Sequence, residues 1–118
     1  MYEYKAKVIR VVDGDTLELD VDLGFNLRFR DKFRVVGVDT PEVYGVKKGS
    51  VEYVAGKKAS EFTTLMICQT KGNMVTIRTE KSCKYGRYLA EVILSDGRSL
   101  GEELIKSGNA KPYFGGKR

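Results

Sequence analysis

The sequence predicts an α+β fold that is mainly β, a small and partly closed five-stranded antiparallel barrel with two helices. Segments in which apolar and polar residues alternate recur along the chain, separated by turns rich in Gly and Asp. One helical pattern follows the third strand and another follows the fifth. No repeat, linker or low-complexity stretch divides the 118 residues. We therefore expect one domain over residues 1–118 with one core.

The N-terminal part of the chain predicts three strands, over residues 4–12, 16–21 and 25–38. Asp13-Gly14-Asp15 lies between the first two, and Asp-Gly between alternating hydrophobics is a strong hairpin signal because glycine tolerates positive φ. Locally, this stretch is either a turn only or also half of a metal site. We place the next turn at Leu23-Gly24.

The third predicted strand has one apolar face and one basic face. Phe29 and Phe33 alternate with Arg28, Arg30 and Lys32. By itself this pattern leaves two interpretations open, an ordinary solvated surface or a surface that binds phosphates.

After residue 42, a loop rich in Gly and Lys leads into a predicted helix that ends near Cys68. Because Gly56 lies inside the helical pattern, the sequence does not define the residue at which this helix begins. The apolar residues at helical spacing, which we expect on one side of it, are Ala55, Ala59, Phe62, Leu65 and Met66.

The last two predicted strands cover residues 74–79 and 87–95. Ser99 followed by Glu102 predicts a capping box that opens a short second helix, and Gly108 is placed to end it. We expect an extended tail after that glycine.

Composition narrows the classes of function. The chain has 21 Lys+Arg against 16 Asp+Glu, a net charge of +5, which favours a polyanionic partner. No apolar run approaches the roughly 20 residues of a membrane span, so we expect no membrane partner. No signal peptide is visible, so we expect the chain as given to be cytoplasmic, or secreted if a leader has been removed.

The sequence contains no histidine, which excludes Ser-His-Asp and Cys-His catalysis and the usual zinc sites. Cys68 and Cys83 form no CxxC motif, and we interpret both as free thiols rather than a disulfide. Chemistry in this chain must therefore use carboxylates, Arg, Lys, Tyr or a hard cation bound by oxygen.

Three polar motifs fall at the ends of predicted strands: "DGDT" at 13–16, "RVVGVDTPE" at 34–42 and "KYGR" at 84–87. Each alone is a plausible turn. Together, in this order and with the closing "LIKSGNAKPY", they resemble the staphylococcal nuclease (thermonuclease) family over nearly the whole chain.

The resemblance implies an OB-type barrel that carries a Ca²⁺-dependent phosphodiesterase site. It implies Asp15 and Asp39 as metal carboxylates, with the backbone carbonyl of Thr40 as a further ligand. These residue types suit the chemistry, because a hard cation neutralises the phosphodiester and planar guanidiniums bind its oxygens. The catalytic residues that it implies are Arg34, Glu42 and Arg87, with Glu42 as the candidate general base.

The resemblance also implies the substrate. Family members hydrolyse the P–O5′ bond of DNA and RNA and leave 3′-phosphate ends, and we expect the same here. We expect single-stranded or flexible nucleic acid to bind to a monomer. The implied substrate-binding residues are Lys84, Tyr85 and Tyr113, together with Lys47 and Lys48 in a basic loop.

Two other readings compete with a nuclease, a non-catalytic OB-fold module that binds nucleic acid and a plain interaction domain. A binding module has no need of the five matched side chains at positions 15, 34, 39, 42 and 87. An EF-hand reading of Asp13-Gly14-Asp15 fails because Glu18 stands where that loop requires glycine. The chain departs from the family pattern at Cys83 and Gly115 and in a longer hairpin between Asp15 and Arg34.

Overall fold

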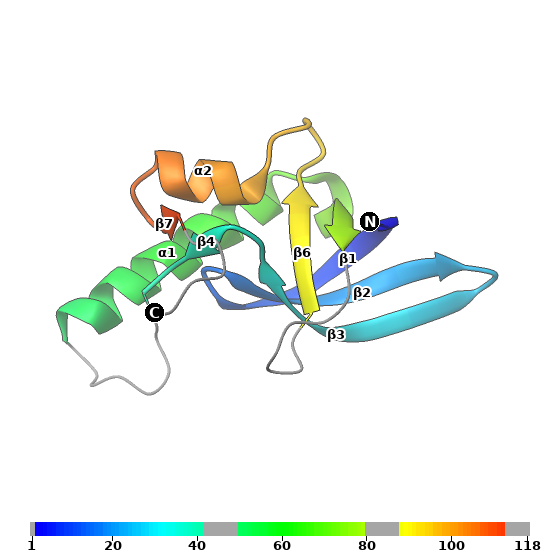
Figure 1. The fold of residues 1–118 in the computed structure, drawn as a ribbon, viewed down its shortest axis with the longest axis horizontal. Coiled ribbons are helices and arrows are strands. Elements are labelled where there is room, and N and C mark those ends of the chain that lie inside the picture. The colour runs from blue at the N-terminus through cyan, green and yellow to red at the C-terminus, as the bar shows by residue number, and fades with distance from the viewer. Residues whose placement is uncertain (1, 42–49, 80–87, 113–118) are drawn as a thin grey trace.

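The computed structural model describes residues 2–41, 50–79 and 88–112. Figure 1 shows the barrel strands, two helices on one side and a long hairpin projecting at the other end. The barrel strands are β1 (Tyr2–Asp13), β2 (Thr16–Gly24), β3 (Leu27–Val35), β5 (Met74–Thr79) and β6 (Tyr88–Ile93). The remaining elements are β4 (Val38–Asp39), α1 (Val51–Cys68), the 3₁₀ turn η1 (Lys71–Asn73), α2 (Leu100–Lys106) and β7 (Lys111–Pro112).

The predicted five-stranded barrel with two helices is confirmed. Its strands follow the order β1-β2-β3-β6-β5 and close on themselves through the antiparallel pairing of β1 with β5. One pair departs from the expected antiparallel arrangement, because β3 runs parallel to β6. The long connection through β4, α1 and β5 makes this pairing possible, since parallel strands need a crossover.

Strand positions match the prediction better than turn positions. The strand expected at 74–79 is found at those residues. The turn expected at Leu23-Gly24 is wrong, because β2 continues to Gly24 and the chain reverses at Phe25 and Asn26, which both have positive φ. The strand expected over 25–38 is interrupted at Gly37, whose φ of 83° lies in the left-handed region.

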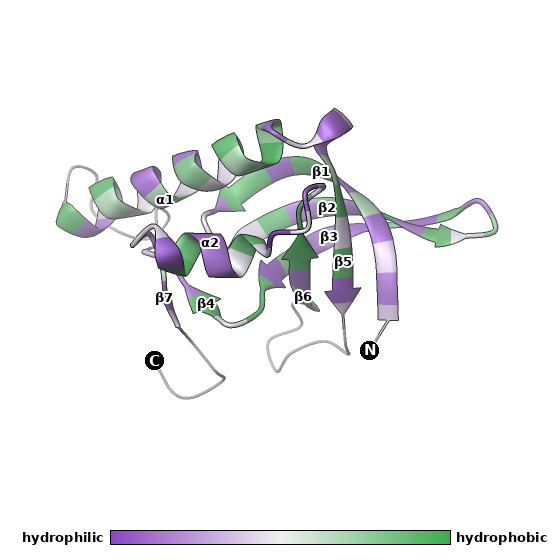
Figure 2. Cartoon of the chain, turned by 90° about the horizontal axis from the view of Figure 1, so that it is seen from above, coloured by the Kyte–Doolittle hydropathy of each residue, from purple (hydrophilic) through white to green (hydrophobic). Residues whose placement is uncertain are grey.

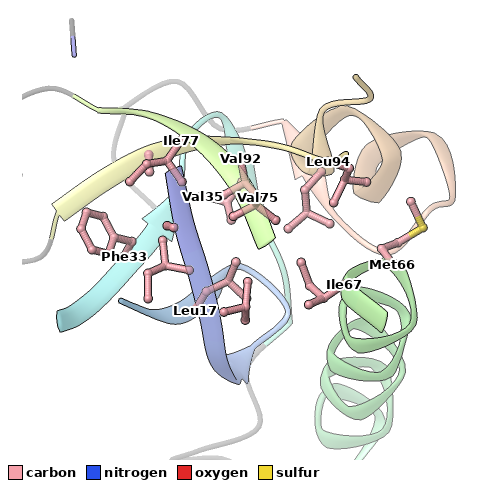
Figure 3. Packing of buried hydrophobic residues seen from close by; sticks show 14 of the residues in the cluster. Leu17, Phe33, Val35, Met66, Ile67, Val75, Ile77, Val92 and Leu94 are labelled. Atoms are coloured by element: carbon pink, nitrogen blue, oxygen red, sulfur yellow. The ribbon is translucent and has the colours of Figure 1, made fainter. Parts of the chain in front are cut away.

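The core fills the barrel and continues under α1. Leu17, Leu19 and Ile77 are fully buried inside the barrel. Figure 3 shows Met66 and Ile67 pointing from α1 toward the same cluster. This packing attaches the helix firmly to the strands that carry the candidate site.

The helix α1 begins after Ser50, whose side chain accepts a hydrogen bond from the Tyr53 N–H and caps the helix. The predicted buried face is right for Ala59 and Met66 but wrong for Leu65, which is 63% exposed. Gly56 lies on the buried side, and at about 100° per residue Leu65 lies opposite it.

The helix α2 follows the predicted N-cap, in which the Ser99 hydroxyl accepts from the Glu102 N–H at 3.4 Å. It ends before Gly108, which has φ of 81°. Cys68 is a free, exposed thiol, as predicted, and Cys83 lies outside the described residues. No helix in the described ranges is long and apolar enough to cross a bilayer.

The predicted basic face of β3 is part of a mixed charged surface. Cross-strand register places Glu18, Asp20 and Asp22 of β2 between the basic residues of β1 and β3. Arg28 pairs with Asp20 at 3.0 Å, and Arg30 pairs with Glu18 at 3.3 Å. The alternation within β3 alone could not reveal this, because the acids come from the neighbouring strand.

Candidate active site

Asp15 directly precedes β2, where the turn from β1 meets the chain just after β4. Its backbone carbonyl accepts a hydrogen bond from the Val35 N–H at 2.8 Å. Its Oδ2 accepts from the Thr40 N–H at 3.2 Å, and its Oδ1 accepts from the Thr16 hydroxyl at 3.1 Å. The side chain is almost buried, so these bonds hold the carboxylate in one orientation.

Arg34 connects the two predicted metal carboxylates. Its Nη1 lies 3.3 Å from Asp15 Oδ2, and its Nη2 lies 3.3 Å from Asp39 Oδ1. Nη2 also donates to the Val38 carbonyl at 3.1 Å. The arginine is only 8% exposed, and a buried guanidinium needs such partners. The two terminal nitrogens of the planar guanidinium thus each contact one carboxylate, although Asp15 and Asp39 are 24 positions apart in the sequence.

The turn that carries Asp15 is packed directly against α1. A Cβ at Gly14 would lie 2.8 Å from the Cβ of Ala59 and 3.1 Å from Cγ2 of Thr40. The buried Thr63 hydroxyl donates to the Gly14 carbonyl at 2.8 Å. A small residue on each side therefore lets the helix touch the turn, and this contact fixes the position of Asp15.

Gly14→Ala is expected to destabilise the protein by about 2 kcal/mol, because the added methyl cannot fit against Ala59 without moving α1. Displacement of Asp15 should also weaken the phosphodiesterase activity that the resemblance implies. Urea unfolding measures the first effect and initial rates of cleavage measure the second.

The matched control is the double variant Gly14→Ala, Ala59→Gly, which restores the space on the facing side. It should recover catalysis even though glycine within α1 costs about 1 kcal/mol of its own. A single Gly14→Ala variant with unchanged stability and rate would show that the contact does not position Asp15.

A cleft of about 680 Å³ opens beside Asp39. Asp39, Thr40 and Pro41 form one wall and residues of early α1 form another. The third wall is residues 108–111, which include the start of β7. The two-residue ladder of β4 with β7 makes Lys111 the cross-strand neighbour of Asp39, whose side chain is partly exposed.

The donors at this site suit a hard cation. Two carboxylates lie against one guanidinium, the Asp39 side chain is 33% exposed, and the other nearby donors are oxygens. The Thr40 hydroxyl is buried without a hydrogen-bond partner in the part of the chain that the structure describes. Within those same ranges no three His, Cys, Asp or Glu side chains gather as a metal-binding group. The described residues thus fit the chemistry of such a cation but would supply only part of its ligands.

The structure brings together four of the predicted site residues, Asp15, Arg34, Asp39 and Thr40. The others lie outside the described residues: Glu42, Lys47, Lys48, Lys84, Tyr85, Arg87 and Tyr113.

Sequence reasoning missed two contributors, Thr63 and Lys111. A threonine one turn after Ala59 on a buried helical face is a usable signal, because a buried hydroxyl requires a partner. Lys111 carries no comparable signal, since its place opposite Asp39 depends on the β4–β7 pairing.

Comparison with known proteins gives a consistent result. The family profile described as "Staphylococcal nuclease homologue" matches residues 32–118. The chain is 37% identical to the endonuclease YhcR of Bacillus subtilis over 95% of its own length and 9% of that protein. It is 38% identical to the thermonuclease of Staphylococcus hyicus, over 95% of the chain and 61% of the relative. A thermonuclease of Staphylococcus intermedius is also 38% identical, over 91% of the chain and 58% of the relative. The chain therefore spans less than two thirds of each of these proteins.

Proposed function

The chain belongs to the staphylococcal nuclease family, and from this premise we propose that it is a calcium-dependent nuclease. It would hydrolyse the P–O5′ bonds of DNA and RNA and leave 3′-phosphate ends. The observation that supports the proposal is the buried Arg34, which pairs with Asp15 and with Asp39, the carboxylate that lines the cleft. A module that only binds nucleic acid gains nothing from two carboxylates at this place, since they repel phosphates.

In the proposed mechanism, Asp15, Asp39 and the Thr40 carbonyl would hold the cation. When bound, the cation supplies positive charge that offsets the charge of the phosphodiester. Arg34 orients the two carboxylates that it contacts and, as a catalytic residue, also donates N–H groups to the phosphate oxygens. The hydrogen bonds to Asp15 keep its carboxylate from rotating away. This preorganisation lowers the cost of assembling the site at the moment of reaction.

Two further side chains complete the proposal. Arg87 donates N–H groups to the phosphate oxygens, and these bonds strengthen as charge shifts in the transition state. Glu42 accepts a proton from the attacking water through its carboxylate, because the chain has no histidine to do so. Lys47, Lys48, Lys84, Tyr85 and Tyr113 would hold the flanking phosphates and bases.

Incubation of the purified protein with single-stranded DNA in Ca²⁺, in Mg²⁺ and in chelator tests this function. We expect cleavage in Ca²⁺, with 3′-phosphate products that a 3′-phosphatase converts, and no cleavage in chelator. Undiminished cleavage in excess chelator would refute the metal requirement. Binding without cleavage in either metal would instead favour the non-catalytic binding module.

A further inference from the structure

The β2–β3 hairpin extends well beyond the barrel, as both ribbon views show (Figure 1 and Figure 2). The apolar face of the hairpin is buried in the core at Leu17 and Val21, and its residues become exposed farther along the strands. Near the end of the hairpin it becomes an exposed apolar patch of three residues, Leu23, Phe25 and Leu27, which we call the hairpin tip. An apolar face that continues past the core contributes little to folding.

Phe25 is the most exposed of the three, at 97%. It also occupies the first central position of the turn with φ of 56°, followed by Asn26 with φ of 62°. Two consecutive positive φ values are typical of hairpin turns that favour Asn or Gly, and a bulky residue is strained there. Phe25 therefore carries a conformational cost without any gain in packing, which points to a role outside the fold.

The hairpin is braced behind its tip. The Phe29 ring packs edge-to-face on Tyr88 of β6 with centroids 5.3 Å apart, and Phe33 lies 5.5 Å from the same tyrosine. On the other face, the ion pairs of Arg28 and Arg30 join β3 to β2. A braced ribbon presents its tip in a defined place, which reduces the ordering cost of binding.

The outer face of the sheet formed by β1, β2 and β3 carries an excess of positive charge, although within the hairpin itself the three bases of β3 are matched by the three acids of β2. Register places six basic residues of β1 and β3 around three acidic residues of β2, an excess of three positive charges. The bases are Lys5, Lys7, Arg10, Arg28, Arg30 and Lys32, and the acids are Glu18, Asp20 and Asp22. A protein partner is less suited to the tip, because stable protein interfaces use about 20 to 30 residues a side.

We propose that the hairpin tip is a second nucleic-acid contact, in which Phe25 stacks on an unpaired base of the strand held at the active site. This inference rests on the proposed function. The tip stands eight residues along β2 from Thr16, which at about 3.4 Å per residue is about 27 Å from the carboxylates. That distance corresponds to about eight nucleotides of a stacked strand, so only long substrates reach both contacts.

The test compares Phe25→Asn with Phe25→Tyr, using oligothymidylates of about four and about 20 nucleotides. Binding of the long oligomer is measured in chelator, where the proposed cleavage cannot interfere. Phe25→Asn should weaken this binding by about 5- to 100-fold, the range for loss of one stacked base, while Phe25→Tyr keeps it. In Ca²⁺, Phe25→Asn should raise KM for the long oligomer and leave KM and kcat for the short oligomer unchanged.

The thermal stability of Phe25→Asn should rise although its binding of the long oligomer weakens. Asn adopts positive φ readily, so Phe25→Asn should raise Tm by about 4 °C while it weakens binding. Leu65→Gln is the matched control, because it removes an exposed apolar residue of α1 and should leave binding unchanged.

Three outcomes would overturn the inference. They are unchanged binding of the long oligomer by Phe25→Asn, a fall in Tm that accompanies lost binding, or self-association in ultracentrifugation that Phe25→Asn abolishes. Absence of cleavage by the unaltered protein counts against the proposed function alone, because the binding measurement in chelator still decides the role of the tip.

Discussion

Changing Glu42 to Gln is expected to lower turnover of single-stranded DNA by about 100-fold or more, with binding in Ca²⁺ close to that of the unaltered protein. Gln keeps the size of the side chain and much of its hydrogen bonding, but it cannot accept the proton of the attacking water. The loss should therefore appear in kcat and only weakly in KM.

Arg87→Lys serves as the companion variant. It keeps the positive charge but loses the planar fork, so its kcat should also fall by about 100-fold if the arginine binds the transition state. Near-normal thermal unfolding of both variants is needed for this comparison. An increase in KM alone would make either residue a substrate contact, and full activity of Glu42→Gln would reject it as the base.

Local sequence predicted the elements well where one strand or helix turn carries the signal by itself. Residues 74–79 alternate cleanly and form β5, and Ser99 caps α2 as its spacing indicates. Prediction failed where a residue that is distant in the sequence determines which side chains are buried. Leu65 is apolar at helical spacing, yet the close approach of Gly14 to Ala59 buries the side of α1 that carries Gly56 and Ala59 and leaves Leu65 exposed.

The same limit applies to charge and to the site. The acids between the basic residues of β1 and β3 belong to β2, so only the register reveals the mixed surface. Asp15 occurs in one motif and Arg34 and Asp39 occur in another, and each motif alone is compatible with a turn. The resemblance to the family predicted that they act together, while the bonds through one guanidinium are visible only in the structure.

Asp15→Asn and Asp39→Asn should be alike in catalysis and unlike in stability. Either change removes one carboxylate from the proposed cation, so both should lose most of the cleavage activity. Asp15 is 4% exposed and bonded to the buried Arg34, so its replacement leaves a guanidinium partly uncompensated. The free energy of unfolding should then fall by about 3 kcal/mol. Replacement of Asp39, whose side chain is partly exposed, should lower the free energy of unfolding by about 1 kcal/mol or less, because solvent screens its ion pair with Arg34.

Two measurements separate these effects. Urea unfolding in chelator gives the stability difference, and the rise of Tm on adding CaCl₂ reports binding of the cation without any substrate. The unaltered protein should show that rise, and both variants should lose it.

Asp96→Asn is the control for the carboxylates. Asp96 is exposed, and hydrogen bonds from the Arg98 backbone and side chain hold its pKa below the usual value. Its replacement should leave cleavage and the calcium-induced rise of Tm unchanged. Equal loss of stability in Asp15→Asn and Asp39→Asn would contradict the assignment of Asp15 as the buried anchor of Arg34. A calcium-induced rise of Tm that survives in both variants would show that the cation binds elsewhere on the chain.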